Sequence, residues 1–146
     1  MGLKTSIEQE KVVFAYMLKH PQYLLHVEKD FFSNDDIQYV AASSREFFKE
    51  YKEAPSCEQM KAILKDDKKD IKNETVDSIY NVDIVSMDEE WLKDTTEAWL
   101  KWRSFNTNFM KAAMLAKTTD VSLDNVRYVV DKCVGMLTDT TLMNFD

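Results

Sequence analysis

The side chains that could do chemistry in this sequence are few and widely spaced. His20 and His26 lie six residues apart with Glu28 nearby, and metal ligands do not use this spacing. A nucleophilic pair between Cys57 and a histidine is compatible with the sequence, because such partners meet only in the fold. Nothing else in the sequence supports that small-enzyme alternative. We therefore predict no catalytic, cofactor-binding or metal-binding residues in this chain.

The glycine content excludes the common nucleotide-binding loops. The chain has only two glycines, Gly2 and Gly135, and they lie far apart. A P-loop needs a glycine-rich turn that ends in Gly-Lys-Ser or Gly-Lys-Thr, and a dinucleotide-binding turn needs several closely spaced glycines. We therefore expect this chain to bind no nucleotide and to hydrolyse none.

Aromatic residues on one long predicted helix, residues 86–117, are the strongest signal. A first apolar stripe at helical spacing includes Trp91, Trp102, Phe105 and Phe109, and a second stripe beside it includes Trp99. One stripe is enough to pack a helix on its own domain, so two adjacent stripes indicate two neighbours. The three tryptophans could instead form a ligand cage, but packing or an interface is the interpretation that we prefer.

Arg103 lies inside this apolar arc and has two interpretations. It could extend its charged end to water at the rim of the helix pair. It could instead form an ion pair across a dimer interface and so set the register of pairing.

Composition predicts an all-α fold. The 146 residues include only 2 Gly and 2 Pro, and 45% are hydrophobic, whereas sheets and long loops use Gly and Pro heavily. We expect serine N-caps at Ser6, Ser33, Ser56, Ser86 and Ser122, with capping boxes completed by Gln9, Gln59 and Glu89. The predicted helices begin after these residues, and the first is apolar on nearly all sides.

We expect a small helical head followed by a long antiparallel helical hairpin. The head comprises residues 1–85, the hairpin residues 86–138 of the same structural domain, and a tail or linker begins at 139–146. The connection after residue 117 is short, and short connections join antiparallel neighbours. A helix of about 46 Å exceeds the diameter of about 38 Å expected for a compact domain of this size, so it should project and meet a partner chain.

The net charge of the chain and its lack of long apolar stretches limit the classes of partner that it can bind. The charge of −7 argues against a dedicated nucleic-acid-binding surface, which needs clustered Lys and Arg. No stretch approaches the roughly 18 apolar residues of a membrane helix, and the N-terminus lacks a signal peptide. Cys57 and Cys133 suit reduced thiols. We therefore expect a cytoplasmic protein that does not bind membranes.

A series of short motifs resembles the N-terminal domain of DnaB-type hexameric replicative DNA helicases. The order and spacing of the motifs carry the resemblance over nearly the whole chain, and the long helix is similar to phage members in particular. The motifs are Ile7-Glu8-Gln9-Glu10, Val13-Phe14-Ala15, Met17-Leu18, Asp30-Phe31-Phe32, Phe47-Phe48-Lys49-Glu50-Tyr51, Ala54-Pro55-Ser56, Met60, Ile63-Leu64, Trp91-Leu92, Thr96-Glu97, Arg103 and Phe105-Asn106.

The resemblance implies an assembly and protein-docking role at the replication fork of a bacterium or a phage-infected host. Hairpins of neighbouring subunits would pair into a collar, a trimer of dimers, that docks primase and in some systems a helicase loader. ATP and Mg²⁺ would belong to a motor domain absent from this chain, whose parent would be an ATP-dependent helicase. DNA would bind this part weakly or not at all.

The predicted interface comprises residues of the long helix and of the helix opposite. A stand-alone dimeric helical adaptor or phage regulator without a motor fits the hydrophobic pattern equally well. The predicted interface residues are Trp91, Trp99, Trp102, Arg103, Phe105, Phe109, Val126 and Val130.

Overall fold

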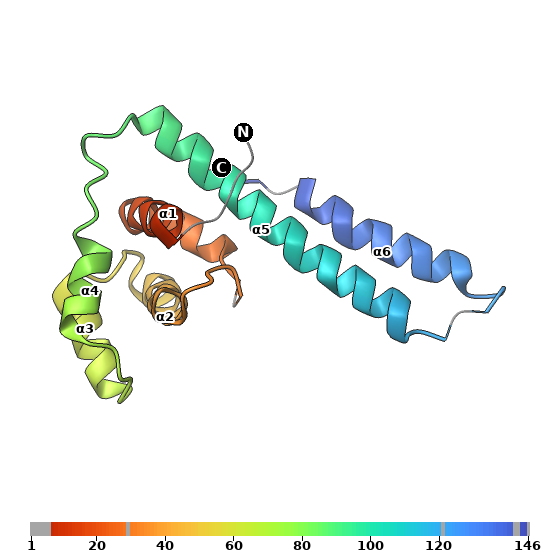
Figure 1. Ribbon diagram of the computed structural model, residues 1–146, viewed down its shortest axis with the longest axis horizontal. Helices are drawn as coiled ribbons and strands as arrows, with labels where there is room; N and C mark the ends of the chain where they lie inside the picture. The colour runs from red at the N-terminus through yellow and green to blue at the C-terminus, as the bar shows by residue number, and fades with distance from the viewer. Residues whose placement is uncertain (1–6, 29, 121, 142–143, 146) are drawn as a thin grey trace. The chain divides into compact units, whose positions relative to one another are not determined.

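In the described part of the chain, all regular secondary structure is helical (Figure 1). The computed structural model describes residues 7–28, 30–120, 122–141 and 144–145, and this part contains no strand, so the all-α prediction is confirmed. No helix in it is long and apolar enough to cross a membrane. The helices are α1 (Ile7–Lys19), the 3-10 helix η1 (Pro21–His26), α2 (Asp35–Tyr51), α3 (Cys57–Asp66), α4 (Asn73–Tyr80), α5 (Glu89–Thr118) and α6 (Val126–Thr141).

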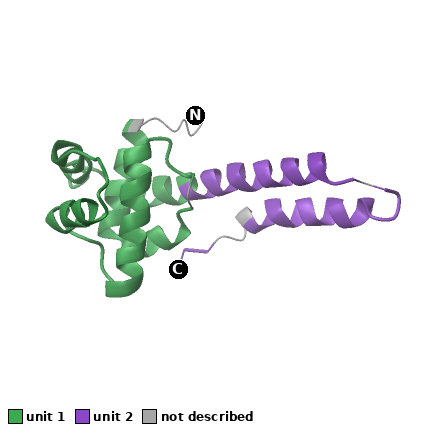
Figure 2. Cartoon of the chain, turned by 90° about the horizontal axis from the view of Figure 1, so that it is seen from below, with its two compact units in different colours: residues 1–99 green, residues 100–146 purple. Residues whose placement is uncertain are grey.

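The chain divides into two compact units, residues 1–99 and residues 100–146 (Figure 2). The division falls inside α5, whereas we expected a boundary between residues 85 and 86. The reason lies in the first half of α5, where Leu92, Thr96 and Trp99 are buried. Unit 1 therefore comprises α1 to α4 and the beginning of α5, and unit 2 comprises the rest of α5 with α6.

Helix α1 is the centre of unit 1. Val13, Phe14, Ala15, Tyr16 and Met17 are all buried, as predicted for a helix that is apolar on nearly all sides. The edge of the Phe14 ring meets Phe32 with the ring centroids 5.7 Å apart. The core therefore surrounds this helix.

The start of α2 differs from our expectation. Asn34, not Ser33, caps the helix, because its side-chain oxygen accepts hydrogen bonds from the backbone of Asp36 and Ile37. The backbone N–H and the hydroxyl of Ser33 instead donate to the carboxylate of Glu10 on α1. Glu10 is 1% exposed, and a buried carboxylate needs such donors. Ser33, the residue that we predicted to cap α2, therefore connects the turn before α2 to α1.

The start of α3 agrees with the sequence pattern. Ser56 and Gln59 form the complete capping box, with Gln59 N–H donating to the Ser56 hydroxyl at 3.1 Å. The ammonium of Lys61 lies 2.8 Å from the carboxylate of Asp77 and so joins α3 to α4. These two helices therefore pack as one layer of unit 1.

The start of α5 is also displaced from the predicted capping box. The carboxylate of Asp88 accepts from the backbone N–H of Trp91 at 2.8 Å, and α5 begins at Glu89. Ser86 instead donates to Asp83 at 3.3 Å. Aspartate suits this position because it both accepts the hydrogen bond and places negative charge at the helix N-terminus.

Two further predicted caps remain. Ser6 lies outside the described residues. Ser122 does not cap α6, which begins at Val126, because residues 123–125 form a turn in which Asn125 Oδ1 accepts from the N–H of Ser122 at 2.7 Å.

The buried contact between Glu10 and Ser33 predicts a stability effect. Glu10→Ala should lower the free energy of unfolding by about 2–4 kcal/mol, because it removes the acceptor of two hydrogen bonds from Ser33 and the packed methylenes of a buried side chain. Urea denaturation followed by circular dichroism measures this loss. Glu8→Ala, at an exposed position on the same helix, is the control and should change stability by no more than about 0.5 kcal/mol. Equal effects of the two variants would contradict the assignment.

Candidate protein interface

Trp99 joins α5 to the core of unit 1. Its side chain is fully buried, with ring centroids 4.8 Å from Phe32 and 6.2 Å from Phe31. Leu92 and Thr96 lie on the same side of α5 and are buried as well. Trp99, which we expected to contact a partner subunit, is therefore a core residue in this conformation.

Two tyrosines hold the first half of α5 to unit 1. Tyr16 donates to Glu89 at 2.9 Å, and Tyr23 donates to Glu97 at 2.6 Å. The Nε2 of His20 lies 3.4 Å from Glu89. Burial, the hydrogen bond from Tyr16 to Glu89 and the neighbouring negative charges raise the pKa of Tyr16 to about 12.

An aromatic ladder continues along α5 in unit 2. The rings of Trp102 and Phe105 stack with centroids 5.9 Å apart, and the rings of Phe105 and Phe109 are 6.0 Å apart. Trp102 is 44% exposed and Phe109 is 52% exposed. Residues three and four apart share a helix face, so the sequence spacing sets up the ladder. It brings together three of the predicted interface residues.

Helix α6 lies beside the last part of α5 and runs back along it (Figures 1 and 2). Val129 is the buried apolar residue of α6, and the thiol of Cys133 lies 3.5 Å from the carbonyl oxygen of Ala112 on α5. Val126 is 43% exposed and Val130 is 53% exposed. We expected these two valines on the hairpin seam and its subunit contact. Each is about half exposed, and α6 contacts α5 more closely through Val129 and Cys133.

Several of the partly or fully exposed apolar residues of α5 and α6 in unit 2 share a face. Phe109 precedes the buried Ala112 by three residues, and Val126 precedes the buried Val129 by three residues, so each pair is rotated by about 60° in the same sense. Because the two helices run in opposite directions, equal rotations from the contact line lead to the same face. We name this surface the ladder face; it comprises Trp102, Phe105, Phe109, Val126 and Val130.

The other two predicted interface residues have different positions. Trp91 belongs to unit 1 and is 52% exposed, and Arg103 is partly buried in unit 2. The sequence interpretation left out Met114 and Tyr128, which are 60% and 65% exposed. The Met110–Met114 spacing of four residues is a signal that could have identified Met114 as an extension of the second stripe.

The described residues contain no group of three or more His, Cys, Asp or Glu that could hold a metal ion. The thiol of Cys57 lies 3.5 Å from Asp77. Burial first, and then the hydrogen bond to Asp77, raise the pKa of Cys57. A raised pKa lowers the fraction of thiolate, which is the nucleophilic form of cysteine.

No protein-family model matches the chain, and comparison with curated proteins and with solved structures finds no similar protein.

Two neighbouring tryptophans on α5 should respond differently to truncation. Trp99→Ala should lower the free energy of unfolding by about 3–5 kcal/mol, because it empties a buried aromatic site. Trp102→Ala, at a half-exposed site with one ring contact, should lower monomer stability by only about 1 kcal/mol. Chemical denaturation at low protein concentration measures both. A larger loss for Trp102→Ala than for Trp99→Ala would contradict the structure.

The tyrosine contact predicts a pH dependence. The pKa of Tyr16 in the folded chain exceeds the unfolded value of about 10, so the contribution of this group to stability is complete below pH 10 and is lost as the pH approaches 12. Tyr16→Phe should remove the tyrosinate absorbance step that appears near pH 12. Tyr51→Phe, at an exposed tyrosine, should leave that step in place. Persistence of the step in Tyr16→Phe would show that it has another origin.

Proposed function

We propose that this chain is a self-association and protein-docking module, and that the ladder face is the surface through which two copies meet. The observation that carries the proposal is the stacked series of Trp102, Phe105 and Phe109, two members of which are about half exposed. Aromatic residues are enriched in protein interfaces. Contiguous exposed apolar surface also indicates an interaction site more often than a solvated one.

The size of unit 2 supports a partner that completes its core. Two helices leave much of their apolar surface in water. The exposed apolar residues along them are Trp102, Phe109, Met110, Met114, Val126, Tyr128, Val130 and Val134. Two such helix pairs can close a four-helix bundle around a shared apolar core. A second copy supplies such a pair without requiring any other protein.

The distribution of charge in unit 2 favours a second copy of the chain. Residues 100–118 carry four basic side chains and no acidic one, whereas residues 119–146 carry five acidic and two basic side chains. The excess of acidic residues lies outside α6, since α6 itself carries two acidic and two basic side chains. Unit 2 as a whole has a net charge of +1, so two copies repel each other little when the same patch faces itself in a symmetric dimer.

The finer form of the proposal is a collar of a DnaB-type replicative helicase, and it rests on the motif resemblance. Under this proposal the head is followed by an antiparallel hairpin, the hairpins pair in a trimer of dimers, and the collar docks primase or a helicase loader. ATP, Mg²⁺ and strand translocation belong to a motor domain elsewhere in the parent protein. The exposed Trp91 and the partly buried Arg103 extend the subunit contact.

The alternative is a dimeric helical adaptor without a motor, which uses the same ladder face. The reading frame downstream of Asp146 separates the two proposals. A frame that continues into a P-loop motif supports the helicase collar, and a stop codon close to Asp146 supports the adaptor.

Truncation of the ladder face should abolish self-association. Trp102→Ala/Phe109→Ala should convert a concentration-dependent dimer into a monomer in sedimentation equilibrium, with at least a hundredfold rise in the dissociation constant, since interface aromatics cost about 2 kcal/mol or more each. The helical circular dichroism signal should not change, because both residues are exposed in one chain.

The matched control truncates two exposed apolar residues of unit 1. Leu25 is 45% exposed and Tyr51 is 57% exposed, so Leu25→Ala/Tyr51→Ala removes comparable surface elsewhere and should leave the dimer intact. A wild-type chain that is monomeric at every concentration, or a ladder-face variant that dimerises normally, would refute the proposal.

A further inference from the structure

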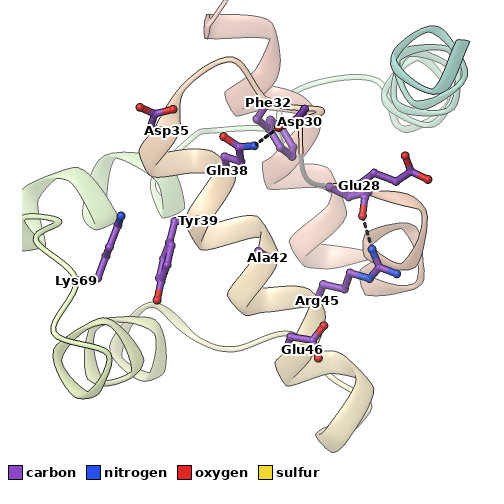
Figure 3. Close-up of a pocket in the computed structure, with 11 residues that line it drawn as sticks. Glu28, Asp30, Phe32, Asp35, Gln38, Tyr39, Ala42, Arg45, Glu46 and Lys69 are labelled. Atoms are coloured by element: carbon purple, nitrogen blue, oxygen red, sulfur yellow. Dashed lines mark hydrogen bonds between the residues drawn. The ribbon is translucent and has the colours of Figure 1, made fainter. Parts of the chain in front are cut away.

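A recess of about 560 Å³ lies over α2 in unit 1. Figure 3 shows its labelled side chains around Ala42. Ala42 is small, and neighbours three and four residues away on a helix stand on the same face, so Gln38, Tyr39 and Arg45 form walls around it. Phe32, from the segment before α2, adds an apolar wall.

Negative charge exceeds positive charge in the lining. Four carboxylates line the recess, and its two cations are bound to neutral groups. The guanidinium of Arg45 donates to the carbonyl of Val27, and the ammonium of Lys69 lies 4.7 Å from the centroid of the Tyr39 ring. Of the lining carboxylates, Glu46 forms an exposed salt bridge with Lys49 at 3.4 Å, and Asp30 accepts a hydrogen bond from Gln38 at 3.3 Å. The four carboxylates are Glu28, Asp30, Asp35 and Glu46.

This combination suits a cation carried on an aliphatic chain. The methyl group of Ala42 and the ring of Tyr39 can cover methylene groups, and carboxylates at the edge can accept charge-assisted hydrogen bonds. The Tyr39 ring already holds the ammonium of Lys69, which shows that a cation is favourable against this surface. A guanidinium fits better than an ammonium because its planar donors pair with carboxylates in two places at once.

The charge of unit 1 indicates where such a cation comes from. Residues 1–99 contain thirteen basic and twenty-one acidic residues, a net charge of −8. A field of this sign attracts a basic polypeptide and repels phosphate groups. We propose that the recess over α2 binds an arginine side chain presented by a basic segment of a partner protein. The site belongs to unit 1 and is separate from the ladder face, so either proposal can fail without the other.

Binding of a synthetic peptide of alternating alanine and arginine tests the proposal. The peptide is titrated into the full chain by isothermal titration calorimetry at low and at physiological salt. The reference is the same peptide with citrulline in place of arginine, since citrulline keeps the shape and loses the charge. The arginine peptide should bind, more weakly at the higher salt, and the citrulline peptide should bind at least about tenfold more weakly.

Two variants that remove the same amount of charge distinguish binding in the recess from attraction by the overall negative charge of unit 1. Glu28→Gln/Glu46→Gln removes two carboxylates of the lining, and Glu53→Gln/Glu74→Gln removes two exposed carboxylates of unit 1 outside it. The first variant should weaken peptide binding at least about tenfold. The second should have an effect of about twofold or less, since screened charges act weakly at a distance.

Two shape variants test the recess without changing any charge. Ala42→Leu fills the recess and should weaken binding at least about tenfold, whereas Ala62→Leu, at an exposed position on α3, should not. Both alanines are exposed, so both variants should keep the wild-type unfolding midpoint, which thermal melting verifies. The proposal is overturned by equal binding of the two peptides, by equal losses in the two charge variants, or by full binding to Ala42→Leu.

Discussion

The burial of Trp99 between Phe31 and Phe32 is the contact on which the organisation of this chain depends. Helix α5 contributes residues to both compact units, and Trp99 is the last of its residues in the core of unit 1. A buried aromatic residue of this size contributes several kcal/mol to stability. The first half of α5 is therefore a core element, and only the second half is available to build a unit with α6.

Polar contacts supplement this apolar anchor at defined points. Tyr16 and Tyr23 bind carboxylates of α5 from α1 and η1, and the carboxylate of Glu10 holds the turn that delivers Phe31 and Phe32. Each contact joins segments that are distant in sequence. Some carboxylates of unit 1 thus accept hydrogen bonds within the unit, and the others lie at its surface, where their charge can select basic partners.

The two proposed surfaces differ in physical character, as their expected partners do. The ladder face is apolar and aromatic, and unit 2 has a net charge of only +1, which suits a second copy of the chain. The recess over α2 is small, partly apolar and rich in carboxylates, which suits one cationic side chain. A docking module can therefore assemble through one unit and recruit through the other.

The sequence by itself determined the features that depend on neighbouring residues. Scarcity of Gly and Pro established the all-α class, the pattern around Ser56 predicted its capping box, and the spacing of Trp102, Phe105 and Phe109 predicted one shared face. These follow from helix geometry and local hydrogen bonds, which act within a few residues.

Only the tertiary structure decided how chemically similar residues divide between core and surface. Trp99 and Trp102 are identical in type and three residues apart, yet Trp99 is buried against Phe31 and Phe32, whereas Trp102 is about half exposed. Ser33 does not cap α2, because its hydroxyl donates to the carboxylate of Glu10, which lies twenty-three residues earlier in the sequence. Local pattern cannot reveal such partners, since long-range packing energy overrides propensity.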